Sequence, residues 1–289
     1  MVWGDVLLRH RGSSDFVPRE TIVTHWDYVP DPSAEPVRYL QEKGFRVLMC
    51  PAIVWGSRMI LPKPETFENV ENSAKVVLEN GSLGMETTLW VPQRYITDTL
   101  PLSLAWAGEM SWSGPKRSLR EFTSEFARVY FGVILNAHSL SIKAFDVLQN
   151  LWQYAADCQE LGDEELRRAR EGELESCMPI ADKIARHRGS VRRHKHEFDA
   201  LVLGADVRVH MERRAVLVHS LILAAREARS LAGPEAADGL SEAAGRIHFV
   251  REEGRGIHRR LLRAWNRRRY SDDPAKENYG VVADHPELI

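Results

Sequence analysis

The sequence TIVTHW at residues 21–26 is a short apolar run that ends in a tryptophan, and it is one of four such runs. The others are VW at residues 2–3, VLMCPAIVW at 47–55 and GMETTLW at 84–90. The four tryptophans are 23, 29 and 35 residues apart, with helical or loop sequence between them. This rhythm is typical of successive strand–helix units, so the runs predict four strands of a parallel sheet.

The elements between and around these runs complete the prediction for the first half of the chain. Strands are expected over residues 2–8, 21–29, 45–56 and 81–92, and helices over 34–43, 68–80 and 97–110. Gly44 is well suited to end the first helix, and Pro51 is expected near the end of the third strand. Four strand–helix units make half of an eightfold (β/α) barrel.

The composition changes near residue 115. Residues 1–115 hold ten of the fourteen prolines and six of the eight tryptophans. Beyond them, Ser118-Leu119-Arg120-Glu121 is a capping-box pattern, and amphipathic helices are expected over about 140–161, 163–188, 190–231 and 239–268. We therefore predict an α/β chain with two domains, a partial barrel over residues 1–114 and an α-helical bundle over 115–289.

Composition also argues against several classes of function. A formal charge of −2 supplies no bulk attraction to nucleic acid, and no run reaches the length of a membrane span. Three cysteines without a CxxC, and no visible signal peptide, favour a cytoplasmic protein in which Cys50 is a buried thiol. The basic run around His194 and His196 lacks a supporting carboxylate or cysteine set, so a solvated helix face is expected, with no metal and no cofactor.

The tryptophans at the strand ends are the candidate binding residues. Trp3, Trp26, Trp55 and Trp90 would line one pocket at the C-terminal end of the strands, where flat indoles suit the apolar face of a sugar ring. The alternative is that they close an ordinary barrel end. Asp5 and Asp27 were expected beside them, Asp5 on the same strand face as Trp3.

The sequence allows more than one role for Asp27 and for Glu86. His25 and Asp27 could form a catalytic dyad, although a sugar-hydroxyl contact by Asp27 is the favoured interpretation because no nucleophile lies nearby in the sequence. Glu86, on the last of the expected strands, could be a buried partner for an arginine.

The motifs WGD at 3–5, HWDY at 25–28, G-x-x-x-T-x-W at 84–90 and AGEMSW at 107–112 occur in that order. Together they resemble the C-terminal half of the catalytic barrel of glycoside hydrolase family 20, which contains β-N-acetylhexosaminidases. The resemblance covers about residues 1–135 and implies that these are the last four strand–helix units of the barrel. It implies substrate-binding roles for Trp3, Asp5, Trp26 and Trp90. Where the family has a glutamate two residues after the last tryptophan, this chain has Pro92, and Gln93 is the candidate substitute.

The resemblance implies hydrolysis in which the 2-acetamido group of the sugar attacks the anomeric carbon while a glutamic acid protonates the leaving oxygen. The family's Asp-Glu pair ends the fourth barrel strand, which would precede residue 1. The only Asp-Glu here, Asp163-Glu164, is expected to begin a helix. The catalytic residues are therefore unknown, and the chain alone is expected to be inactive.

Two classes of function follow. The chain is either part of an enzyme that cleaves terminal β-linked N-acetylhexosamine or a non-catalytic module that binds a carbohydrate or a partner. A strand that begins at residue 2 has no preceding strand to pair with, which suggests a piece of a longer protein. Exposed strand edges could also pair two copies into a homodimer.

Overall fold

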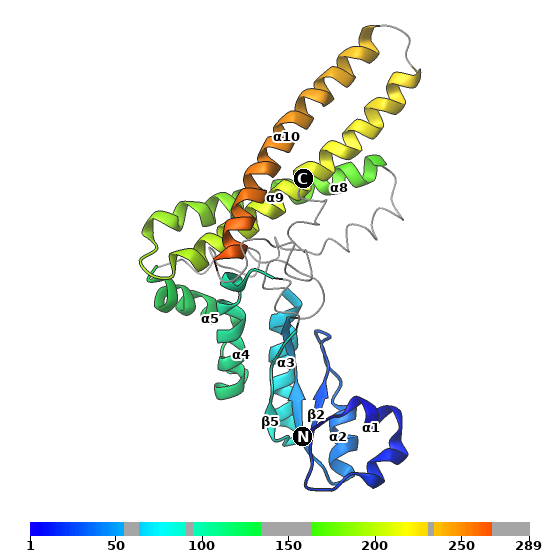
Figure 1. The fold of residues 1–289 in the computed structure, drawn as a ribbon, viewed down its shortest axis with the longest axis vertical. Coiled ribbons are helices and arrows are strands. Elements are labelled where there is room, and N and C mark those ends of the chain that lie inside the picture. The colour runs from blue at the N-terminus through cyan, green and yellow to red at the C-terminus, as the bar shows by residue number, and fades with distance from the viewer. Residues whose placement is uncertain (55–63, 91–94, 134–162, 231–233, 268–289) are drawn as a thin grey trace. The chain divides into compact units, whose positions relative to one another are not determined.

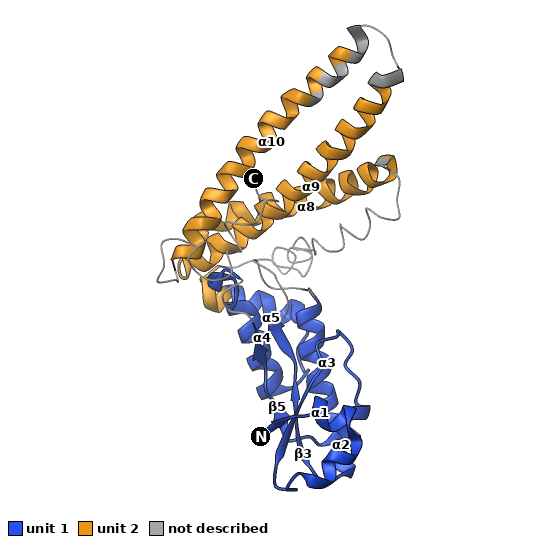
Figure 2. Cartoon of the chain, turned by 45° about the vertical axis from the view of Figure 1, so that its right-hand side comes forward, with its two compact units in different colours: residues 1–127 blue, residues 128–289 orange. Residues whose placement is uncertain are grey.

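The computed structural model describes residues 1–54, 64–90, 95–133, 163–230 and 234–267 (Figure 1). The chain is a mixed α/β protein, mostly helical, with a small parallel sheet. It forms two compact units, Met1–Ala127 and Arg128–Ile289 (Figure 2). The division falls after residue 127, beyond the boundary at 114 that composition suggests, because helices on both sides of residue 114 pack together within the first unit.

The first unit contains a four-stranded sheet in which all neighbours are parallel. Its order is β1 (Val2–Trp3), β2 (Ile22–Trp26), β3 (Arg46–Cys50) and β5 (Gly84–Met85). A second parallel pair joins β4 (Ala52–Val54) to β6 (Thr88–Leu89). The prediction of parallel strands in chain order is confirmed, since sequence neighbours are also neighbours in the sheet.

Helices follow the strands along the chain. They are α1 (Asp5–Arg9), α2 (Glu35–Glu42), α3 (Pro64–Asn80), α4 (Pro101–Ser113) and α5 (Leu119–Phe126), with short 3-10 turns η1 (Arg11–Phe16) and η3 (Thr97–Thr99). The core under one sheet face joins the buried Val23 and Val47 of the strands to Leu7, Val37 and Leu40 of α1 and α2. Beyond α2, Gly44 has φ 84°, the left-handed conformation expected of a residue that ends a helix.

The first strand is shorter than the sequence indicated. A strand over residues 2–8 is wrong: pairing stops at Trp3, and α1 begins at Asp5. The apolar residues of this segment serve a helix face, with Leu7 buried in the core. Three apolar residues in a row fit a strand and a short helix equally well, and here packing against β2 and α2 selects the helix. Asp5 therefore does not alternate with Trp3 along one strand.

The third and fourth strands are each interrupted once. Pro51 separates β3 from β4, since it lacks the N–H that a central strand donates to its neighbour. Glu86 and Thr87 separate β5 from β6. Hydrogen bonds continue across both interruptions, because Glu86 N donates to Met49 O at 2.9 Å and Thr88 N to Pro51 O at 2.8 Å.

The end of the first unit is held by aromatic packing. The expected capping box is present at α5, where Ser118 Oγ accepts from Glu121 N and the Glu121 side chain accepts from Ser118 N. Trp106 of α4 is fully buried, donates its indole N–H to Phe67 O at 3.0 Å, and meets the ring of Phe122 edge-on at 5.1 Å between centroids. These contacts join α3, α4 and α5.

The second unit is helical, as expected. After the short π-helix η4 (Ala127–Phe131) come α8 (Asp163–His187), the turn η5 (Arg188–Ser190), α9 (Lys195–Ser230) and α10 (Pro234–Asn266). Asp163 begins α8, as the sequence indicated, and the expected helix over 140–161 lies outside the described residues. Helix α9 packs against both α8 and α10.

Buried charges connect these three helices. Glu212 of α9 is 4% exposed and lies 2.8 Å from Arg208 Nη2 and 3.6 Å from Arg170 Nη1 of α8. His210 Nδ1 lies 2.8 Å from Glu253 Oε2 of α10. Both α8 and α10 are thus tied to α9 by ion pairs as well as by apolar contacts. Across the part of the chain that the structure describes, none of the helices has the length and apolar character needed to span a bilayer.

Candidate functional site

Four aromatic side chains meet where the strands of the first unit end. The ring centroids of Trp3 and Trp90 are 6.0 Å apart, and those of Trp26 and Tyr28 are 5.2 Å apart. Trp90 Nε1 donates to the Tyr28 hydroxyl at 2.6 Å and so connects the two pairs. Trp3, Trp26 and Trp90 are 43%, 38% and 42% exposed, so each ring packs on a neighbour and still presents a surface.

Strand register explains why these rings gather on one side of the sheet. Trp3 is paired with Thr24, and Thr24 and Trp26 point the same way because they are two residues apart on β2. Val23 and His25 alternate with Thr24 and Trp26 along β2 and so point to the opposite side. There Val23 enters the core with α1 and α2. The tryptophans therefore lie on the sheet face that α1 and α2 leave uncovered.

Trp3 is the last residue of β1, the first strand in the sheet order, whereas Trp90 follows β6, the last strand that the structure describes. Their contact shows that the two side chains reach toward each other from strands that are not hydrogen-bonded neighbours. The two strand ends are therefore joined here by side-chain contact and not by backbone pairing.

A carboxylate lies on the same face. Thr24 Oγ1 donates to Glu86 Oε2 at 3.2 Å, and Thr24 itself is buried. Because Thr24 is the register partner of Trp3, Glu86 lies next to the aromatic cluster. Within the described residues no arginine pairs with Glu86, and the hydrogen bond that it accepts comes from Thr24, so an arginine partner stays a prediction. We call Trp3, Trp26, Tyr28, Glu86 and Trp90 the aromatic face.

The Cys50 thiol and the Tyr28 phenol both have raised pKa values. Cys50 is fully buried, as expected, and burial raises the pKa of its thiol to about 12, with the nearby charge of Glu86 acting in the same direction. Burial also raises the pKa of the Tyr28 phenol, against hydrogen bonds with Thr88 and Trp90 that lower it. A thiol in this state is not a nucleophile near neutral pH.

Asn69 of α3 fixes the loop that carries Tyr28, and sequence reasoning missed it. The Asn69 side chain is fully buried; its Nδ2 donates to Asp27 O at 2.9 Å and to Val29 O at 2.6 Å. Its Oδ1 accepts from Ala52 N at 3.2 Å. One amide therefore joins the end of β2 to the start of β4. The sequence indicates this role only through the presence of an asparagine within an amphipathic helix.

His25 and Asp27 do not form a catalytic pair on the aromatic face. His25 is 6% exposed, its Nε2 has no hydrogen-bond partner among the described residues, and burial lowers its pKa despite the opposing charges of Asp27 and Glu35. Asp27 Oδ1 accepts from Val29 N at 3.2 Å and so shapes its own loop. Since His25 points to the side of the sheet opposite Trp26, it belongs to the core.

The remaining candidate residues fall into three groups. Asp5 lies in the first turn of α1, where a carboxylate is favourable, and a ligand contact by Asp5 stays a prediction. Trp55 and Gln93 lie outside the described residues. The basic run of the second unit is exposed at His194 and His196. Within the described ranges, no group of three or more histidine, cysteine, aspartate or glutamate side chains is arranged to hold a metal ion.

Comparison with known proteins adds no assignment. No protein-family model matches the chain, and no curated protein matches it in sequence.

Proposed function

We propose that the aromatic face binds a sugar of the N-acetylhexosamine type. The single observation that carries the proposal is the contact of Trp3, Trp26, Tyr28 and Trp90 with one another at the strand ends, on the sheet face where Thr24 holds the carboxylate of Glu86. Half-exposed indoles contribute apolar contact to the faces of a sugar ring, and a carboxylate beside them accepts hydrogen bonds from its hydroxyl groups. Both kinds of contact are needed, because a sugar has apolar faces and a polar rim.

We further propose that this face belongs to the last four strand–helix units of a barrel similar to that of glycoside hydrolase family 20. The parallel pairing in chain order and the strand-end position of the tryptophans support this interpretation. The tryptophans whose roles the resemblance implies are those that contribute to the aromatic face. Localisation in the cytoplasm and pairing of two copies remain predictions.

Binding without cleavage is the expected behaviour of the chain as it stands. The family reaction needs a glutamic acid that protonates the leaving oxygen and a neighbouring aspartate that orients the acetamido group. The only Asp-Glu sequence, Asp163-Glu164, begins α8 of the helical unit, and Glu164 is held by Arg167 and Arg168. Because general acid–base catalysis contributes about 10²–10⁴-fold, a chromogenic N-acetylglucosaminide should not be hydrolysed above background.

Tryptophan fluorescence tests the binding proposal. N-acetylglucosamine titrated into the purified chain should quench emission in a saturable way, and Trp90→Ala should abolish that quench because it removes the ring that contacts both Trp3 and Tyr28. The matched control is Trp112→Ala, since Trp112 lies on α4 and is 93% exposed. The control should retain the saturable quench. A quench that survives in Trp90→Ala would overturn the assignment.

A further inference from the structure

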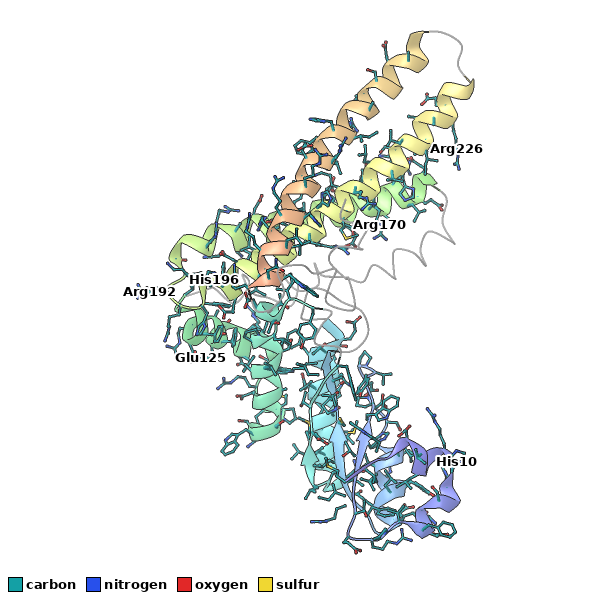
Figure 3. All side chains as sticks on the ribbon, viewed as in Figure 1. His10, Glu125, Arg170, Arg192, His196 and Arg226 are labelled. Atoms are coloured by element: carbon teal, nitrogen blue, oxygen red, sulfur yellow. The ribbon has the colours of Figure 1, made fainter. Side chains whose placement is uncertain are left out.

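A pocket lies in the helical unit, separate from the proposed sugar site in sequence and residues. It encloses about 540 Å³ between the end of α8, η5, the first turns of α9 and the last turns of α10. Pockets that hold small organic ligands usually measure about 300–1,000 Å³. His196, labelled at the start of α9 in Figure 3, contributes to its wall.

The wall of this pocket is strongly basic. Among the described residues of the lining, Asp199 is the single carboxylate and the arginines are Arg188, Arg260, Arg263 and Arg267. These residues carry a formal excess of three positive charges with histidine neutral. These arginines come from two basic segments about 70 residues apart in the sequence, the end of α8 and the end of α10. The fold therefore concentrates charge that is dispersed along a chain of net charge −2.

Part of this charge is already compensated. Arg188 donates to both oxygens of Asp199, at 2.6 and 3.2 Å, and Arg260 is paired with Asp206. For Arg263 and His196, by contrast, the described residues provide no ion-pair or hydrogen-bond partner. Arg263 projects from the last turns of α10 as an available guanidinium, and a guanidinium presents two parallel N–H groups to an oxyanion.

The remaining wall is apolar. Leu203 and Val202 of α9 and Ala264 of α10 are buried and line the same space. A bare inorganic ion would leave these groups unused, whereas an anion with an apolar body would contact them. Among the described residues that line the pocket there is no phenylalanine, tyrosine or tryptophan. Since binding of single-stranded nucleic acid relies on bases stacked on aromatic rings, this wall suits a small molecule better than a strand of RNA or DNA.

We propose that this pocket binds a small organic phosphate, with the phosphate on Arg263 and Arg188 and the organic part against Leu203 and Ala264. Binding is reversible and forms no covalent bond. Asp199 competes with the ligand for Arg188, because the same guanidinium N–H groups serve the carboxylate in the absence of ligand. Asp199 thereby weakens binding. Removing its charge should strengthen binding, whereas removing Arg263 should weaken it.

The test uses phenyl phosphate as the probe, titrated calorimetrically into the full chain at fixed ionic strength. Arg263→Ala should weaken binding about tenfold or more, since hydrogen bonds to charged groups are among the stronger ones. Asp199→Asn should strengthen it by a few fold. The matched control is Arg246→Ala, which removes an exposed arginine of the same helix that pairs with Glu242 outside the pocket. The control should bind as the unmodified chain does.

Several outcomes would overturn the proposal. Absence of binding at millimolar phenyl phosphate would do so, as would equal losses in Arg263→Ala and Arg246→Ala, which would indicate a general charge effect. Equal affinity for inorganic phosphate would show that the apolar wall contributes nothing to binding. A short single-stranded oligonucleotide that binds more tightly, with the same dependence on Arg263, would assign the pocket to nucleic acid. Circular dichroism of each variant establishes that the helices are intact.

Discussion

Trp90 Nε1 lies 2.6 Å from the hydroxyl of Tyr28, and this hydrogen bond joins two strand ends that are 62 residues apart in the sequence. Tyr28 follows β2 and Trp90 follows β6. The bond fixes the edge of one ring against the edge of the other, so that their faces stay available. The geometry of the aromatic face therefore depends on a polar contact as well as on ring packing.

Tyr28→Phe tests that dependence, because it keeps the ring and removes the acceptor for Trp90. Since a hydrogen bond contributes about 0.5–1.5 kcal/mol net, N-acetylglucosamine should bind roughly two- to tenfold more weakly in the fluorescence titration. The matched control is Tyr39→Phe, a tyrosine of α2 whose hydroxyl lies 3.4 Å from Arg11 O. Equal affinities in Tyr28→Phe and the unmodified chain would show that the bond does not order the site.

Asn69→Ala should destabilise the first unit more than an ordinary surface substitution. It deletes three hydrogen bonds of a fully buried side chain and leaves their backbone partners at Asp27, Val29 and Ala52 unsatisfied. At about 1 kcal/mol for each bond, the free energy of unfolding in urea, followed by tryptophan fluorescence, should fall by about 3 kcal/mol.

The control for Asn69 lies one turn further along the same helix. Asn72 Nδ2 donates to Pro30 O at 2.9 Å in an exposed position, so Asn72→Ala should cost about 1 kcal/mol or less. Similar losses in the two variants would mean that burial of Asn69 adds nothing to its contribution.

His25 should make the first unit sensitive to acid. Burial lowers the pKa of His25 below 6.5, so the unfolded chain takes up this proton at a higher pH than the folded chain does. Stability from this residue is therefore complete above pH 6.5 and falls as the pH drops from 6.5 toward the lower folded pKa. Urea midpoints at pH 7.5, 6.5 and 5.5 should decrease less in His25→Gln than in the unmodified chain.

His10→Gln is the control for that experiment, because His10 is exposed at the end of α1. It should retain the pH dependence of the unmodified chain. If His25→Gln and His10→Gln give the same slope against pH, the acid sensitivity originates elsewhere.

Glu212→Ala should destabilise the helical unit by about 3 kcal/mol, at the lower end of the cost of breaking a buried ion pair. It removes the carboxylate that Arg208 and Arg170 share, while Glu173 still pairs with Arg208. Thermal unfolding followed by circular dichroism at 222 nm reports mainly on these long helices. Glu242→Ala removes the carboxylate of an exposed pair with Arg246 and should cost less than about 1 kcal/mol. Equal melting temperatures for the two variants would contradict the role assigned to Glu212.

Features of the sequence that act locally were predicted well. The apolar run that ends in Trp26 places β2 correctly, Gly44 ends its helix in the left-handed conformation, and the Ser118 capping box forms. Each of these depends on residues within a few positions of one another. The tryptophans could therefore be assigned to strand ends before their contacts were known.

Features that depend on distant partners could not be predicted in this way. The segment after Trp3 becomes a helix because Leu7 packs with residues of β2 and α2. Glu86 finds Thr24 at a separation of 62 residues, and nothing near Glu86 in the sequence indicates that partner. The basic pocket brings together the end of α8 and the end of α10, which are separated in the sequence by the whole of α9. Considered one at a time, the two basic runs predict only two solvated helix surfaces.

Asn69 also sets an order of events in folding. The loop after β2 is held by a side chain 42 residues further along the chain, so it cannot become rigid until α3 has docked. Pairing of β2 with β3 does not depend on α3, because Trp26 and Cys50 are register partners in the parallel ladder of these two strands. The aromatic face should therefore mature after the sheet has formed, and the amide of Val29 should gain protection from hydrogen exchange together with those of α3.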